Sequence, residues 1–175
     1  MLGFRDSSAL TIAFSWFGYA HALKAADLGS HKMTASLGIS PLDGRKFTYA
    51  RFAALLDGRK GAIKPVLMDQ SVIAGIGNVY IQDVLFKAKL HPARRIPDIA
   101  EQERKALFQA IRDNLRAATE LGGLAYERDL HGRHGRFKDF LVGYKEGQPC
   151  PECAATIQKV RTGSTAQFIC PKCQT

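Results

Sequence analysis

The 175-residue sequence contains no apolar run long enough to cross a membrane, and it has no internal repeat or low-complexity tract. A membrane-spanning helix needs about 20 consecutive apolar residues. The amino terminus also lacks the basic stretch followed by an apolar one that marks a secretory signal peptide. We therefore expect a globular, cytoplasmic protein with one or two domains and no membrane partner.

Acidic residues are scarce relative to basic ones. The chain has 16 Asp and Glu against 25 Lys and Arg, which gives a formal net charge of +9 and a sequence pI near 9.6. Such a charge favours a polyanionic partner, and nucleic acid fits best. A basic solvated surface without a specific ligand is the alternative that charge alone leaves open.

Cysteine is missing from all but the last 26 residues, which argues against a disulfide framework for the whole chain. The four cysteines form two C-x2-C pairs with sixteen residues between the pairs. This spacing lets four thiolates surround one Zn²⁺ tetrahedrally, with Zn–S distances of about 2.3 Å. The sequence therefore predicts one structural Zn²⁺, bound by Cys150, Cys153, Cys170 and Cys173.

The segment between the cysteine pairs predicts a β-hairpin. Residues 156–161 and 166–169 are strand-like, and Thr162, Gly163 and Ser164 suit the turn between them. Together with the metal they predict a zinc ribbon, in which Zn²⁺ folds a segment too short to hold a core. A basic face suited to phosphate is predicted on the hairpin, formed by Lys159, Arg161 and Lys172. Solvated surface charge explains each of these residues equally well.

Most of the chain before the ribbon predicts helices, apart from an alternating strand pattern over residues 9–17. No other alternating run lies between residues 18 and 46. The strand therefore either packs on the helical domain or belongs to a larger β domain. After residue 126 the sequence becomes polar, basic and rich in glycine, which predicts a loop that continues to residue 147.

Four helices are predicted from capping residues and helical spacing. The first follows a Thr48 cap and ends at Gly58, and Pro65 is expected at the first position of the second. The third follows Asn78. The fourth begins at a capping box formed by Asp98 and Glu101. Its apolar positions are Leu107, Ile111, Leu115 and Ala118, and it ends at Gly122 and Gly123.

Residues 70–80 place two glycines and an asparagine before an apolar helix. Glycine lets a backbone approach a phosphate closely, and the free amides at a helix start attract anions. Asn78 is expected either to cap the helix or to donate its amide to a phosphate. A tight turn with a capping asparagine and no ligand is the plainer alternative.

These motifs together resemble the formamidopyrimidine-DNA glycosylase and endonuclease VIII family. Residues 62–70, 74–80, 85–86 and 91–92 resemble the family's helix-two-turn-helix signature, and residues 150–174 resemble its zinc finger. The resemblance covers about residues 47–174, and residues 9–21 are similar to the end of the family's amino-terminal β-sandwich. It implies a mainly α fold with a small β zinc ribbon.

Three domains follow from this resemblance. They are a remnant of the β-sandwich with a linker over residues 1–46, a helix-two-turn-helix domain over residues 47–145, and a four-cysteine zinc finger over residues 146–175.

The resemblance also implies a function in base-excision DNA repair. Such enzymes flip a damaged base out of the duplex, and the amine of an amino-terminal proline attacks the sugar, which leads through a Schiff base to strand cleavage. The expected partner is double-stranded DNA with damaged bases or abasic sites, bound by a monomer associated with the nucleoid. In the family, the residues that match Asn78 and Lys64 contact phosphates. The complete expected DNA-binding set is Lys64, Gly77, Asn78, Tyr80 and Arg161.

Two departures from the family pattern bear on activity. The chain starts Met1-Leu2-Gly3-Phe4 instead of Pro-Glu, so no catalytic residue is expected in it and the glycosylase and lyase chemistry is assigned to a longer parent protein. The family's phosphate-binding finger arginine aligns with Thr165, which has no guanidinium. Either Arg161 reaches across the hairpin to replace it, or DNA is held differently in this branch of the family.

The sequence leaves several alternatives open. A free-standing DNA-binding module without enzymatic activity is the alternative function, and a zinc-ribbon domain for protein interaction is a third. The loop over residues 127–136 either contacts the lesion base or is a solvated linker. The damaged base itself is not specified.

Overall fold

The computed structural model describes residues 2–12, 20–162 and 165–175. They belong to two compact units, Met1–Ala35 and Ser36–Thr175. In the first unit, β1 (Leu2–Gly3) pairs antiparallel with β2 (Ala9–Leu10), and a 3-10 helix, η1, spans Ala25–Asp27. Of the described residues in the strand predicted over residues 9–17, the first two are in a strand. Positions 11 and 12 are not in a strand, and positions 13–17 lie outside the described residues.

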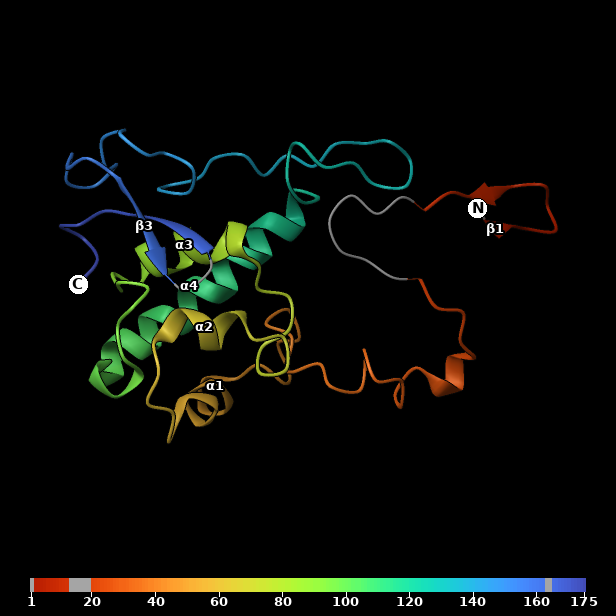
Figure 1. The fold of residues 1–175 in the computed structure, drawn as a ribbon, viewed down its shortest axis with the longest axis horizontal. Coiled ribbons are helices and arrows are strands. Elements are labelled where there is room, and N and C mark those ends of the chain that lie inside the picture. The colour runs from red at the N-terminus through yellow and green to blue at the C-terminus, as the bar shows by residue number, and fades with distance from the viewer. Residues whose placement is uncertain (1, 13–19, 163–164) are drawn as a thin grey trace. The chain divides into compact units, whose positions relative to one another are not determined.

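The second unit is mainly helical, as predicted. It contains α1 (Tyr49–Leu56), α2 (Ile63–Met68), α3 (Asn78–Lys87), the 3-10 helix η2 (Ile96–Asp98) and α4 (Glu101–Glu120) (Figure 1). Helix α3 packs against both α2 and α4, and α1 packs on α4. One apolar core joins the four helices, and its fully enclosed members include Phe52, Leu56, Ile63, Leu67, Ile81, Val84, Leu85, Leu107 and Ile111.

Helix α1 begins and ends where the sequence predicts. The Thr48 hydroxyl accepts a hydrogen bond from the Arg51 amide at 3.4 Å, which satisfies one of the free donors of the first turn. After the helix, Gly58 has a φ of +74°, a conformation that glycine adopts without steric cost.

Two predicted helix starts were wrong by about two residues. Helix α2 begins at Ile63, so Pro65 occupies its third position and not its first. That position still lies in the first turn, where the missing proline N–H has no intrahelical partner to lose. At α4, the Ala100 amide donates to Glu103 Oε2 at 2.7 Å, whereas Asp98 belongs to η2. The capping box therefore uses the next suitable acid along the chain.

Residues 36–46, which the sequence grouped with the amino-terminal segment, belong to the helical unit. Ile39 forms a parallel bridge with Ile73, and the Ala74 amide donates to the Ile39 carbonyl at 3.0 Å. Gly38 lies so close to the turn after α2 that a Cβ there would meet the Val72 carbonyl carbon at 2.3 Å. This segment is therefore fixed to the turn that leads into α3.

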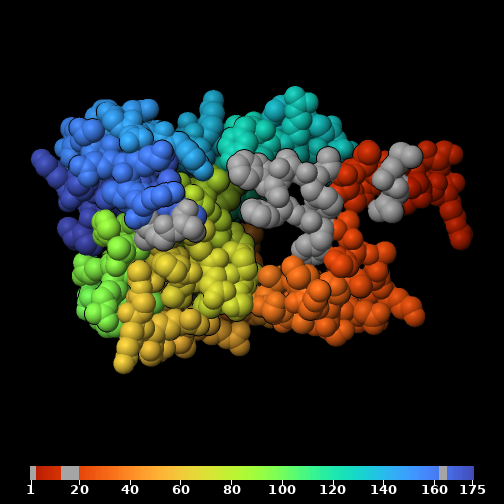
Figure 2. Space-filling model, in the orientation of Figure 1, coloured from red at the N-terminus to blue at the C-terminus, as the bar shows by residue number. Residues whose placement is uncertain are grey.

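The carboxyl-terminal segment is the predicted hairpin. Strands β3 (Gln158–Thr162) and β4 (Thr165–Ile169) pair antiparallel, with Arg161 opposite Ala166 and Lys159 opposite Phe168. Strand β4 lies against α3, and Phe168 packs with Phe86 of that helix. Figure 2 shows the ribbon residues seated directly against the helical residues.

No helix within residues 2–12, 20–162 and 165–175 is both long and apolar enough to cross a membrane.

Candidate zinc site and nucleic-acid interface

Four cysteine sulfurs gather at the base of the hairpin, as the spacing predicts. All four Sγ atoms lie within 4.8 Å of one another, with Cys150 and Cys173 separated by 3.9 Å and Cys153 and Cys170 by 3.4 Å. None of the four forms a disulfide. A tetrahedral site with Zn–S bonds of about 2.3 Å requires sulfurs roughly 3.8 Å apart. The donor set therefore fits one structural Zn²⁺.

Repulsion among the four close sulfurs, when they are ionised, also favours a bound cation. Burial and hydrogen bonds from the neighbouring thiols raise the pKa of Cys173 well above its ordinary value. Four thiolates at this separation repel one another unless a metal ion neutralises them. Zn²⁺ would supply that charge and hold the two knuckles of the ribbon together.

Asp83 on α3 anchors the segment that leads into the ribbon. It is 2% exposed, and its carboxylate accepts hydrogen bonds from the amides of Leu141, Val142 and Gly143 at 2.8, 3.0 and 3.0 Å. Hydrogen bonds to a charged acceptor are stronger than neutral ones. This carboxylate therefore fixes the start of the ribbon on the helix.

Two buried glutamines complete the attachment. Gln82 of α3 accepts from the Phe168 amide at 3.0 Å and donates to the Asn78 carbonyl at 3.1 Å. Gln174 accepts from the Cys170 amide at 3.0 Å and donates to the Leu90 carbonyl at 2.9 Å. Gln82 thus bonds the middle of α3 to the ribbon, and it also bonds to Asn78, the first residue of the same helix.

The turn before α3 is braced by one side chain, Gln70. Its amide oxygen accepts from the Gly75 amide at 2.8 Å, and its amide nitrogen donates to the Ile76 carbonyl at 3.0 Å. Gly75 has a φ of +99°, which favours glycine. The brace therefore fixes the chain just before the helix begins.

Gly77 is the N-cap of α3, and Asn78 is the first residue inside the helix. Within the described part of the chain, no side chain caps this end, and a Cβ added at Gly77 would meet no atom within 4 Å. The predicted capping role of Asn78 is therefore wrong, because a residue within the first turn is past the capping position. Among the residues that the structure describes, the buried Asn78 Oδ1 atom has no hydrogen-bond partner. The open N–H groups and positive dipole of this end are available to an anion.

Lys64 and Thr165, which the sequence singled out separately, are in contact. The Lys64 Nζ atom donates to Thr165 Oγ1 at 2.8 Å, across 101 residues of sequence. The lysine is 2% exposed, and desolvation lowers its pKa to about 8. The ribbon position without the family's arginine is therefore occupied by a threonine that holds a lysine of α2.

Arg161 and Tyr80 are placed differently from each other. Residues that pair directly across a hairpin share a face, so Arg161 lies on the face of Ala166, opposite the face of Thr165. Arg161 is exposed on that face. Tyr80 is half-buried, its ring is 5.6 Å from that of Phe137, and it lines a cavity of about 140 Å³. Burial raises the pKa of Tyr80.

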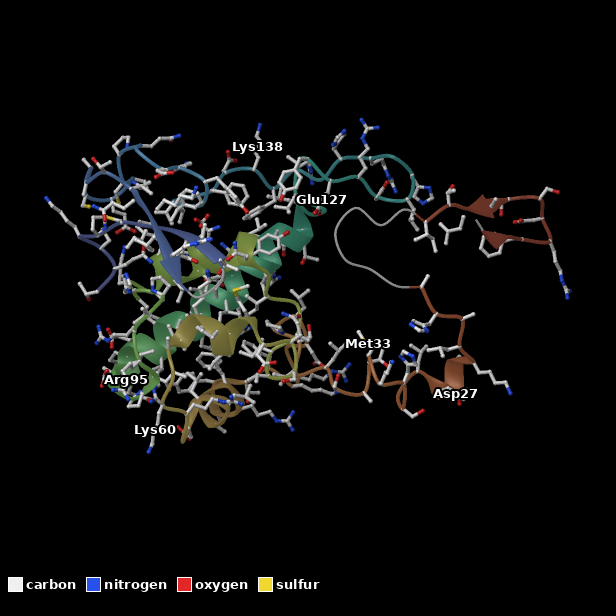
Figure 3. All side chains as sticks on the ribbon, viewed as in Figure 1. Asp27, Met33, Lys60, Arg95, Glu127 and Lys138 are labelled. Carbon is white, nitrogen blue, oxygen red and sulfur yellow. The ribbon has the colours of Figure 1, made fainter. Side chains whose placement is uncertain are left out.

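Residues 126–136 form the expected loop, stabilised by local contacts. The Asp129 carboxylate accepts from the amides of His131 and Arg133 and from Arg133 Nε at 3.0 Å. The backbone hydrogen bond from the Arg133 amide is the largest cause of the lowered pKa of Asp129. Leu130 at the tip is 88% exposed. Figure 3 shows Glu127 near the start of this loop and Lys138 just after its end, where the chain continues toward the ribbon.

The sequence does not predict the residues that bond the helical unit to the ribbon and to the segment before it, which are Gln82, Asp83 and Gln174. Nor does it predict the contacts by which Gln70 fixes the turn before α3. For Asp83 and Gln82, the available signal was two polar residues among the apolar positions of a helix that is otherwise buried on that side. Their partners lie 58 to 86 residues away, so spacing alone does not identify them.

The helical unit, the uncapped glycine–asparagine start of α3 and the four-cysteine ribbon define the class of zinc-containing helix-two-turn-helix proteins. The family described as "Formamidopyrimidine-DNA glycosylase H2TH domain" matches residues 37–128, and the "Zinc finger found in FPG and IleRS" matches residues 147–175. The chain belongs to the formamidopyrimidine-DNA glycosylase family.

Individual relatives agree with this assignment. The chain is 44% identical over 161 residues to a formamidopyrimidine-DNA glycosylase of Roseiflexus sp. (strain RS-1), an alignment that covers 90% of the chain and 58% of the relative. It is 36% identical over 163 residues to that of Gluconobacter oxydans (strain 621H), again covering 90% and 58%. The chain therefore spans less than two thirds of the length of the curated relatives it matches.

Solved structures show the same fold. The MutM (Fpg) protein of Thermus thermophilus superposes with a TM-score of 0.77 at 32% identity, covering 85% of this chain and 57% of that one. The Lactococcus lactis Fpg in complex with DNA containing an abasic site gives a TM-score of 0.79 at 28% identity, covering 87% and 56%.

Proposed function

We propose that the chain binds double-stranded DNA with damaged bases or abasic sites, as the carboxyl-terminal part of a base-excision-repair glycosylase. The observation that carries the proposal is the uncapped start of α3, where Gly77 faces open space and Asn78 follows. Family membership and the net charge of +9 support it. A monomer associated with the nucleoid is the form proposed to act.

The proposed contacts are mainly to the phosphate backbone. The amides at Gly77 and Asn78 provide hydrogen-bond donors at a helix start, which suits a phosphate oxygen. Lys64 adds a cation, and Arg161 adds a guanidinium on the exposed hairpin face. Tyr80 is assigned to the same interface, where its packing on Phe137 supports the first turn of α3.

We assign the bond-breaking chemistry to the part of the family that this chain does not match. The alignment covers 58% of the Roseiflexus relative, which leaves 42% of that relative outside the matched region. Schiff-base chemistry requires an amine held beside the sugar, and loss of orientation alone removes many orders of magnitude in rate. The 175-residue chain by itself is therefore proposed to bind damaged duplex without cleaving it.

Binding to a fluorescent duplex that contains an abasic-site analogue tests the proposal. The wild-type chain is expected to bind it, and Asn78→Ala is expected to weaken binding by about 1 to 3 kcal/mol, since a phosphate loses its amide donor. Gln102→Ala, which removes an exposed amide on α4, is the matched control and should leave binding unchanged. Equal affinities for wild type and Asn78→Ala would contradict the assignment of the α3 start.

A further inference from the structure

Lys64 is a cation enclosed between two elements that are far apart in sequence. It belongs to α2, is 2% exposed, and donates from Nζ to the Thr165 hydroxyl on β4 at 2.8 Å. Among the residues that the structure describes, none of the ion pairs includes Lys64. An ammonium group has three N–H donors. The threonine hydroxyl occupies one of them and brings no negative charge.

Such a site is unfavourable for a cation until an anion arrives. A buried charge normally needs a partner of opposite sign as well as hydrogen bonds. Desolvation alone lowers the pKa of Lys64 to about 8, so the free protein holds an ammonium that loses its proton easily. A phosphate oxygen would supply the negative charge and accept the remaining donors.

We propose that Thr165 is a positioning residue for Lys64, holding the ammonium between α2 and β4 so that a phosphate of the bound duplex supplies the missing anion. This inference rests on the proposed DNA-binding function. Thr165 then acts through Lys64 and need not contact DNA. Arg161 lies on the other face of the hairpin, so it does not share this position.

The charged groups on the neighbouring elements do not account for the lowered pKa of Lys64. These groups are Asp83 and Lys87 on α3 and Lys159 and Arg161 on β3. None of them is a cause of the shift in the Lys64 pKa. Titration of Lys64 itself should therefore govern how this contact depends on pH. The ammonium is lost as pH rises through about 8, and DNA affinity should fall with it.

A double-mutant cycle tests the positioning role. Affinity for a duplex with an abasic-site analogue is measured near neutral pH for wild type, Thr165→Val, Lys64→Met and the double variant. Each single change is expected to weaken binding about tenfold, as for a hydrogen bond to a charged group. The double variant should bind no more weakly than Lys64→Met. Thr165→Ser, which keeps the hydroxyl, should restore affinity to within about threefold of wild type.

The pH profile and a direct titration complete the test. As pH rises through about 8, the wild-type affinity should fall more steeply than that of Lys64→Met. Exposed Lys60→Met is the matched control and should keep the wild-type profile. Nuclear magnetic resonance of the Lys64 side chain in the free wild-type protein should give a pKa of about 8. This measurement needs no variant to fold.

Three results would overturn the inference. The first is a Lys64 pKa at the ordinary lysine value. The second is that Thr165→Val weakens duplex binding equally in the wild type and in Lys64→Met. The third is that Lys64→Met leaves the pH dependence of duplex affinity unchanged. If Asn78→Ala weakens binding while Lys64→Met and Thr165→Val do not, this inference fails and the proposed function stands. If the wild-type chain does not bind the duplex, both fail.

Discussion

Gly75 and Gly77 lie two residues apart before α3, yet a methyl group would have different effects at the two positions. Gly75 has a φ of +99°, which strains any residue with a Cβ, so Gly75→Ala should destabilise the fold by about 1 to 3 kcal/mol. Gly77 has a φ of −105° and open space around it, so alanine fits there without strain. Gly77→Ala should therefore change stability by less than about 0.5 kcal/mol.

The same pair of variants separates folding from binding. Gly77→Ala is expected to weaken duplex binding at nearly wild-type stability, because the added methyl group stands where the phosphate approaches. Urea unfolding gives the stability, and fluorescence anisotropy gives the affinity. Unchanged affinity in a folded Gly77→Ala variant would mean that no phosphate comes close to this residue.

Lys64 should make the stability of the free chain depend on pH. Its pKa is about 8 in the folded protein and ordinarily 10.5, so the unfolded chain binds more protons between these values. The free energy of unfolding should therefore rise across this pH range, by on the order of 1 to 3 kcal/mol. Lys64→Met should lose this rise and be more stable than wild type near neutral pH. Lys60→Met, an exposed control, should follow the wild-type curve.

At the scale of elements, Asp83 determines how the ribbon segment is attached to α3. Its carboxylate accepts three backbone amides, and Asp83→Ala would leave all three buried or half-buried without their acceptor. We expect a loss of about 3 kcal/mol or more in the free energy of unfolding. Asp113→Ala on the exposed side of α4 is the control and should cost less than about 0.5 kcal/mol. Equal effects in urea unfolding would show that Asp83 has no special role.

The elements that sequence predicted best are those determined by local spacing. Each of these features depends on residues that are close together in the sequence. Examples are the Thr48 cap, the spacing of Leu107 and Ile111 along α4, and the spacing within each cysteine pair. The start predicted at Pro65 was misplaced because proline fits the third position of a helix as well as the first. The start predicted at Asp98 was misplaced because a second acid, Glu103, takes the capping role. The Glu103 carboxylate reaches the Ala100 amide, which leaves Asp98 to η2.

The sequence predicted individual residues of the candidate site, but it did not predict the contacts between them. Asn78, Lys64 and the zinc ligands were identified from motifs, whereas the contact between Lys64 and Thr165 spans 101 residues. The same holds for Gln82, whose partner Phe168 lies 86 residues later in the chain. Contacts of this kind follow from how α3 and β4 pack, which local spacing does not specify.

For the whole molecule, Zn²⁺ should couple ribbon folding to DNA binding. A segment this short cannot form a core without its metal, and its hydrogen bond to Gln82 helps fix α3. Removing the metal with a chelator, or changing Cys153→Ser, should lower the melting temperature and weaken duplex binding together. Added Zn²⁺ should restore both in the chelated wild type, while Mg²⁺ should not. Retention of full affinity without metal would contradict this coupling.

Catalysis is the second property of the whole molecule. The 175-residue chain is expected to bind an abasic duplex but to form no borohydride-trapped adduct with it, because we assign the bond-breaking chemistry to the part of the family that this chain does not match. The measurement is denaturing electrophoresis of the trapped reaction, with an unrelated basic protein as the control. A covalent adduct, with strand cleavage well above that control, would show that the chain has lyase activity of its own.

The salt dependence of duplex binding tests the central claim most directly, because phosphate contacts release counterions and base contacts do not. The logarithm of the binding constant should fall linearly with the logarithm of salt concentration, with a slope of about −0.9 for each phosphate neutralised. Contacts of Lys64 and Arg161 with phosphates therefore predict a slope of about −2 or steeper. In Arg161→Ala the slope should be less negative by about 1. A slope near zero, or binding that Arg161→Ala and Asn78→Ala leave unchanged, would contradict a phosphate interface formed by the α3 start and the ribbon.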